Sequence, residues 1–190
     1  MPFDKKTLLD FLEILDKEMT KEITLVAAGG TAMTLLDMKT STVDIDFTIP
    51  SEHVKQFENA LKVTPHGFRI DYWTDGMVFS QILPDDYLEK STSIKTNLKN
   101  INLKALNPVD IVVTKIGRLD ERDLQDIKVC IEKFKLTKNQ IKSRSKNIEY
   151  VGHEDNYKIN LEYTMKTLFK KILERLKQQG IIKDEMMTKF

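Results

Sequence analysis

Multiple cysteines, long apolar runs and a large excess of one charge are all missing from this sequence of 190 residues. Cys130 is the only cysteine, which excludes an intrachain disulfide framework and a zinc site built from several cysteines. No apolar run approaches the roughly 18 residues that a transmembrane helix needs. The N-terminal segment has charges among its apolar residues and does not resemble a signal peptide. We therefore expect a cytoplasmic protein.

The composition itself is that of an ordinary globular protein, with 41% hydrophobic and 31% charged residues. The net charge of +1 hides an uneven distribution along the chain. Residues 1–130 carry 16 basic and 21 acidic side chains, whereas residues 131–190 carry 14 and 8. A basic C-terminal third fits a polyanion such as RNA or an acidic partner protein, and it also fits a lysine-rich helical surface exposed to solvent.

Strands and helices alternate in the first part of the sequence. Apolar residues at helical spacing predict helices, and the alternation of polar and apolar residues predicts strands. The predicted elements are a helix at 5–19, a strand at 22–28, a helix at 31–38, a strand at 43–50, a helix at 52–62 and a strand at 67–73.

The remainder of the sequence is mostly helical in character. Strands are predicted at 77–83 and 101–106, and Asn107 with Pro108 is typical of a helix start. Predicted helices follow at 107–119, 120–134, 137–146 and 157–180, the last after a linker at 152–156. We therefore predict an α+β fold, with a domain at residues 1–135 and a helical extension at 136–190.

Asp44 and Asp46 are two residues apart in a predicted strand, so their carboxylates project from the same face. Two like charges at this distance repel each other unless a cation or hydrogen-bond donors neutralise them. Mg²⁺ suits such a pair, because it takes carboxylate oxygens and keeps waters or phosphates as its other ligands. Asp71 adds a third carboxylate if its strand lies beside that of Asp44 and Asp46. The alternative is a strand face that is simply solvated.

Gly29 and Gly30 stand at the end of the predicted strand before this one. Glycines let the backbone approach a polyphosphate closely, and the helix that follows presents unpaired N–H groups. Thr31 would add a hydroxyl group. A glycine pair in a turn between strand and helix is common, so its meaning depends on the aspartates that follow it.

The order of these motifs resembles the nucleotidyltransferase superfamily, which has the DNA polymerase β-like fold. The resemblance rests on the glycine pair, thirteen intervening residues and the stretch Asp44-Ile45-Asp46. The stretch that begins with GGTAM and ends with KTSTVDID is similar to the corresponding stretch of minimal nucleotidyltransferases and of abortive-infection-type toxin enzymes. The segment "PVDIVVTKIGRLDERDLQDI" resembles a downstream helix of these proteins. The resemblance covers about residues 20–135 and implies a mixed β-sheet flanked by helices.

The resemblance also implies roles for individual residues. Asp44, Asp46 and Asp71 would bind the metal ions, either Mg²⁺ or Mn²⁺, and Asp71 would activate the attacking hydroxyl group. Gly29, Gly30 and Thr31 would hold the triphosphate, and Lys115 would contact phosphate. Further candidates are Arg118, Arg122 and Asp123.

The motifs and the resemblance together lead to two candidate functions. The first is a metal-dependent enzyme that transfers a nucleoside monophosphate from a nucleoside triphosphate to a hydroxyl group of RNA, such as a tRNA end, of a protein or of a small molecule. The second is a non-catalytic module of the same fold that binds a nucleotide, RNA or a partner protein. The resemblance to toxin enzymes adds an antitoxin as a candidate partner. The apolar stripe of the predicted helix at 157–180 would pack within the chain or against a second copy of it, as in a homodimer.

Overall fold

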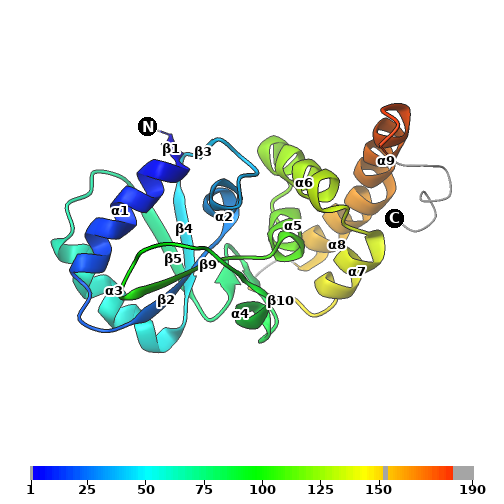
Figure 1. Ribbon diagram of the computed structural model, residues 1–190. Coiled ribbons are helices and arrows are strands. Elements are labelled where there is room, and N and C mark those ends of the chain that lie inside the picture. Colours follow the sequence, from blue (N-terminus) through cyan, green and yellow to red (C-terminus); the bar gives the residue numbers. More distant parts are fainter. Residues whose placement is uncertain (1, 152–153, 182–190) are drawn as a thin grey trace. The chain divides into compact units, whose positions relative to one another are not determined.

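The chain divides into two compact units in a computed structural model that describes residues 2–151 and 154–181 (Figure 1). The first unit comprises the residues up to 79 together with 83–107, and the second comprises 80–82 together with the residues from 108 onward. The main boundary therefore follows Asn107, earlier than the predicted boundary after residue 135. The helices on either side of residue 135 pack into one helical unit, which explains the difference.

A five-stranded mixed sheet forms the centre of the first unit, and it confirms the predicted α+β class. Its strand order is β5-β4-β2-β9-β8. Strands β2 and β9 are parallel, as are β4 and β5, whereas β2 with β4 and β8 with β9 are antiparallel. The strands are β2 (Ile23–Ala27), β4 (Ile45–Ile49), β5 (Ile70–Thr74), β8 (Thr92–Ser93) and β9 (Ile101–Ala105).

Helix α3 (Ser51–Val63) covers one face of strands β4 and β5. Its buried Phe57 packs edge-on against Phe47 of β4 and Tyr72 of β5, which are neighbours in the sheet register. Helix α1 (Lys5–Lys17) packs beside α3. Because successive residues of a strand point to opposite faces, Asp46 and Asp71 point away from Phe57. The sheet thus separates an aromatic core face from a face that bears carboxylates.

Helix α2 (Gly29–Leu35) begins at the glycine pair itself, two residues before the predicted start. The structure also contains short elements that the sequence pattern did not predict. Residues 77–83 form two separate two-residue strands rather than one continuous strand. The additional elements of the first unit are β1 (Phe3–Asp4), β3 (Ser41–Thr42), β6 (Met77–Val78) and α4 (Tyr87–Lys90).

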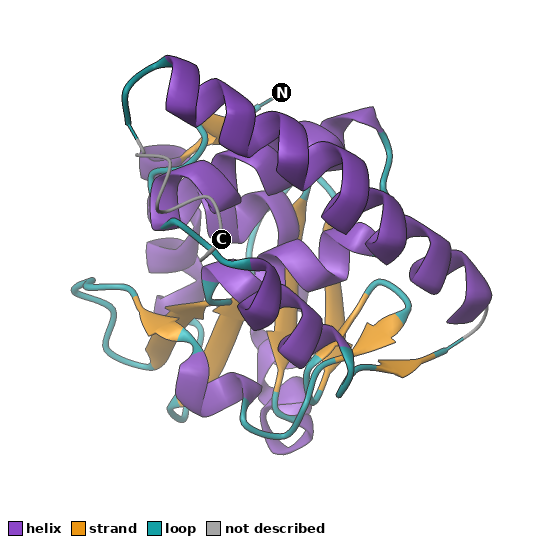
Figure 2. Ribbon diagram, turned by 90° about the vertical axis from the view of Figure 1, so that its right-hand side faces the viewer, coloured by secondary structure: helices purple, strands orange, loops and turns teal. Residues whose placement is uncertain are grey.

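The second unit is largely helical in its described part, apart from the antiparallel strands β7 (Gln81–Ile82) and β10 (Glu149–Tyr150) (Figure 2). Helix α5 packs against both α6 and α7. None of the helices in the described ranges is long and apolar enough to cross a membrane. The helices are α5 (Pro108–Ile116), α6 (Glu121–Phe134), α7 (Lys138–Ser145), α8 (Glu154–Tyr163), the π-helical segment η1 (Thr164–Leu168) and α9 (Phe169–Gln178).

The predicted helix 157–180 is present, but it begins earlier and contains the π-helical segment. Helix α8 starts at Glu154, inside the predicted linker, of which residues 152 and 153 lie outside the described ranges. A π-turn contains an extra residue and so rotates the helix face that follows it. Met165, Phe169, Ile172 and Leu176 are buried, whereas Leu168 is only partly buried.

Asp16, near the end of α1, fixes the start of strand β9. Its Oδ1 accepts hydrogen bonds from the amides of Asn100 and Ile101 at 2.7 and 2.8 Å, and its Oδ2 accepts one from the amide of Lys99 at 2.9 Å. The carbonyl group of Asp16 accepts a fourth bond from the Asn100 side chain. One buried carboxylate therefore satisfies three consecutive backbone donors where β9 joins the sheet.

Replacing Asp16 by Asn tests this anchor. The amide nitrogen cannot accept a hydrogen bond, so at least one backbone N–H group loses its acceptor. We expect Asp16→Asn to lower the free energy of unfolding by about 1.5–3 kcal/mol, measured by urea denaturation. The control is Asp10→Asn in the same helix, which removes only an exposed ion pair with Lys6 and should cost about 0.5 kcal/mol or less. Equal losses in the two variants would contradict the anchoring role.

Candidate active site

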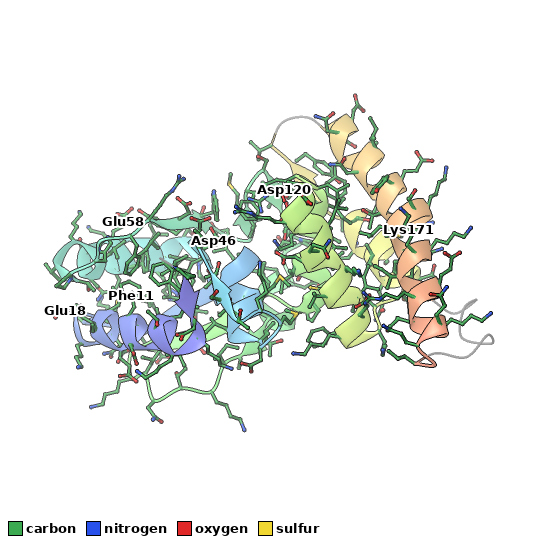
Figure 3. All side chains as sticks on the ribbon, turned by 90° about the horizontal axis from the view of Figure 1, so that it is seen from above. Phe11, Glu18, Asp46, Glu58, Asp120 and Lys171 are labelled. Atoms are coloured by element: carbon green, nitrogen blue, oxygen red, sulfur yellow. The ribbon has the colours of Figure 1, made fainter. Side chains whose placement is uncertain are left out.

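Asp46 and Asp71 lie directly beside each other in the sheet. Strands β4 and β5 are parallel, and their register pairs Asp46 with Asp71. Residues paired in this way project from the same face at neighbouring positions. Asp44 precedes β4 by one residue and is exposed, whereas Asp46 is 6% exposed and is labelled in Figure 3. The burial of Asp46 does not fit a solvated strand face.

Two threonine hydroxyl groups hold the segment that carries Asp44 and Asp46. Thr31 Oγ1 donates to the carbonyl oxygen of Asp44 at 3.1 Å and accepts from the amide of Asp46 at 3.0 Å. Thr42 Oγ1 donates to the same carbonyl oxygen at 3.0 Å. Thr31 is only 1% exposed. Its hydroxyl group positions the two aspartates, and its expected contact with phosphate stays a prediction.

The glycine pair is required by close packing around these aspartates. Gly29 has φ of +51°, and a Cβ atom there would lie 2.8 Å from Asp46 Oδ2. A Cβ atom at Gly30 would lie 2.5 Å from Thr42 Oγ1. Side chains at either position would push the carboxylate or the threonine away. The start of α2 therefore lies against the Asp46 carboxylate, which brings together the two halves of the sequence motif.

Arg69 is a cation at this site that the sequence pattern did not single out. Its Nε donates to Asp71 Oδ1 at 2.7 Å. This hydrogen bond and the charge of Asp71 raise the pKa of Arg69, and the charges of Asp44 and Asp46 contribute in the same direction. The guanidinium group therefore lies within the field of all three carboxylates. Its position two residues before Asp71 was the only signal in the sequence, and its meaning depends on the sheet register.

The donor set suits a hard divalent cation in its chemistry, since it consists of carboxylate oxygens beside a closely packed backbone turn. In the described ranges, no group of three or more His, Cys, Asp or Glu side chains is arranged so that it could hold a metal ion. The ion pair of Asp71 with Arg69 turns one of the three carboxylates toward a protein cation. The assignment of Asp44 and Asp46 to a metal ion stays a prediction.

Lys115 lies in the second unit in a buried cluster of charges. Its Nζ contacts Asp123 Oδ1 at 2.8 Å and Asp126 Oδ2 at 2.7 Å, and Lys115 is 3% exposed. Burial acts to lower the pKa of Lys115, but the two carboxylates outweigh it and raise the pKa. Lys115 is thus charged and joins α5 to α6. Its expected contact with phosphate stays a prediction, and the geometry gives it a structural role.

The three weaker candidates also belong to the second unit. Arg118 donates to both carboxylate oxygens of Asp123, which is itself 1% exposed. The amide of Asp123 donates to Asp120, the N-cap of α6, which is labelled in Figure 3. Arg122 is exposed. Asp126 is the cluster member that the sequence did not indicate as a partner of Lys115, because the pairing depends on how α5 and α6 pack.

Removing the Thr31 hydroxyl tests whether it holds the aspartate segment. In Thr31→Val the buried amide of Asp46 loses its acceptor, and we expect the free energy of unfolding to fall by about 1–3 kcal/mol. Hydrogen exchange at the Asp46 amide, followed by NMR, should accelerate. The control is Thr34→Val in the same helix, since Thr34 is equally buried but bonds only to the carbonyl group of Gly30. Unchanged exchange at Asp46 in Thr31→Val would contradict this role.

Replacing Lys115 by Met separates a structural role from a phosphate contact. The change leaves two buried carboxylates without their main cation, so we expect a loss of about 3–5 kcal/mol in the free energy of unfolding. Adding Asp126→Asn should recover part of that loss, because it removes one of the stranded charges. Stability unchanged in Lys115→Met, with weaker binding of inorganic tripolyphosphate, would instead support the phosphate contact.

Comparison with known protein families gives one match, and it agrees with the resemblance of the sequence motifs. A family model described as a nucleotidyltransferase of unknown function (DUF6036) matches residues 6–176. Searches of curated proteins and of solved structures gave no significant match. The match includes Gly29, Asp46 and Asp71 of the first unit and continues through the helices of the second. The chain therefore belongs to this family of nucleotidyltransferases of unknown function.

Proposed function

We propose that the chain is a Mg²⁺-dependent enzyme that transfers a nucleoside monophosphate from a nucleoside triphosphate to a hydroxyl group. The observation that carries this proposal is the register of β4 and β5, which places Asp46 beside Asp71 on the face next to Gly29. Membership of the nucleotidyltransferase family supports the reaction class.

The residues divide the chemistry between them. Asp44 and Asp46 would hold Mg²⁺, which when bound would offset the negative charge of the phosphates. Gly29 has no side chain, so the Asp46 carboxylate lies against the start of α2, and phosphates held through a metal ion on Asp46 would lie near that backbone. The acceptor oxygen would attack the α-phosphorus, the bond to the β-phosphate oxygen would break, and pyrophosphate would leave. Asp71 would accept the proton of the acceptor hydroxyl group, and Arg69 orients the Asp71 carboxylate.

The charge distribution favours a polyanionic acceptor. Residues 131–190 carry 14 basic and 8 acidic side chains. RNA would be attracted to such a segment, whereas a neutral small molecule would not. We therefore place RNA first among the acceptors, before a protein hydroxyl group and a small molecule.

The test is transfer of label from each α-labelled nucleoside triphosphate, with Mg²⁺, to total tRNA, other RNA or protein from a lysate. We expect label on one acceptor class, and we expect Asp46→Asn to lower the transfer rate by about 100-fold or more. The matched control is Glu58→Gln. Glu58 accepts a hydrogen bond from Tyr72, the neighbour of Asp71 in β5 that points to the opposite face. Its loss should leave transfer nearly unchanged.

The same assay distinguishes the enzyme from a non-catalytic binding module. The ion pair between Arg69 and Asp71 is the observation that favours the module, because it engages the residue expected to act as the base. A module would bind nucleotide in the presence of Mg²⁺, lose that binding in Asp46→Asn and transfer no label. If neither transfer nor Mg²⁺-dependent nucleotide binding occurs, both functions are wrong.

A further inference from the structure

Phe79 adopts a backbone conformation that bulky side chains avoid. Its φ is +56°, in the left-handed region that residues with a side chain rarely adopt. The residue separates β6 from β7 and so interrupts the strand that the sequence predicted. Strain of this kind persists where the surrounding structure or a function compensates for it. The position of the Phe79 ring, next to the candidate site, points to binding.

The Phe79 ring lies beside the glycine and the aspartate of the candidate site. A Cβ atom at Gly29 would be 3.3 Å from Cζ of Phe79 and 2.8 Å from Oδ2 of Asp46. The ring edge and the carboxylate therefore approach the same point of the α2 start. Gly29 lets both of them come close, since it has no side chain.

Trp73 extends this aromatic surface along β5. It follows Asp71 by two residues, so both side chains project from the same face of the sheet. The Trp73 and Phe79 rings pack edge to face, with centroids 5.2 Å apart and an interplanar angle of 68°. Both residues are only partly buried. A partly buried pair of aromatic rings thus adjoins the carboxylates within the first unit.

We propose that Phe79 and Trp73 form the surface on which the base of the nucleotide stacks. This inference rests on the proposed function, which brings the phosphates to Gly29 and Asp46. A nucleotide held there has its base a short distance from the phosphates, and the aromatic pair is the apolar planar surface beside them. Stacking of a base on an aromatic ring is worth about 1–3 kcal/mol and tolerates every base. The site therefore takes purine and pyrimidine nucleotides with small differences in affinity.

The sole tryptophan of the chain provides a direct readout. Trp73 is the only tryptophan, so its fluorescence reports on this surface alone. With Mg²⁺ present, we expect each of the four nucleoside triphosphates to quench Trp73 emission. We expect each to bind about 5- to 100-fold more tightly than inorganic tripolyphosphate, which has no base, in calorimetric titrations.

Variants at Phe79 separate base stacking from simple packing. Phe79→Gly suits the positive φ and should abolish the preference for nucleoside triphosphate over tripolyphosphate while leaving thermal stability nearly unchanged. Phe79→Leu keeps apolar bulk without the ring and should reduce the preference at least several-fold. The control is Phe134→Ala, which removes a partly exposed ring of α6 in the second unit and should leave the preference intact.

Each contrary outcome has a distinct meaning. Equal affinities of the native protein for nucleoside triphosphates and tripolyphosphate would overturn the stacking surface and leave the proposed function standing. A loss of stability in both Phe79 variants with an unchanged preference would assign the ring to packing and would also overturn the inference. No Mg²⁺-dependent binding of either probe would overturn both this inference and the proposed function.

Discussion

The adjacency of Asp46 and Asp71 is the constraint on which the candidate site depends. Two carboxylates in neighbouring strands repel each other, so the structure has to hold them by other interactions. Thr31 fixes the backbone on both sides of Ile45, Gly29 lets α2 approach the Asp46 carboxylate, and Arg69 supplies a positive charge. Thr31 and Gly29 thus position the segment that carries Asp46, whereas Arg69 reduces the repulsion by its charge.

The second unit differs from the first in that it contains ion pairs that are buried between helices. Arg144 of α7 donates to both carboxylate oxygens of Asp110, and Lys115 contacts two carboxylates of α6. Helix α5 thus bears one buried acid and one buried base, each matched to a different neighbouring helix. Breaking such a pair is costly, since the remaining charge stays buried. The pairs therefore join α5 to α7 and to α6, in addition to the apolar residues that α5 buries.

The sequence predicted those parts of the site that depend on local spacing. The alternation around Asp44 and Asp46 indicated the strand, and the glycine pair indicated the connection from β2 to α2, where it forms the first residues of the helix. Arg69, the partners of Lys115 and the contact of Phe79 with Gly29 all depend on strand register or helix packing, which spacing along the chain does not determine. The same reason explains why the observed boundary differs from the predicted one after residue 135, since α5 packs with α7 and α6 packs with α9 across that position.

The balance of charge at the three carboxylates connects the structure to the proposed chemistry. The carboxylates of Asp71, Asp44 and Asp46 all act on the Arg69 guanidinium group and raise its pKa, and Asp46 and Asp71 are partners in the sheet register. Arg69 balances one of them through its hydrogen bond with Asp71. Under the proposed function, Asp44 and Asp46 would hold a divalent cation beside this ion pair. A protein that needed only a stable sheet would place apolar or uncharged residues here, because they remove the repulsion altogether. The acids therefore lie beside the start of α2 and a partly buried aromatic pair, which is the arrangement that the proposed function uses to bind a cation with a nucleotide.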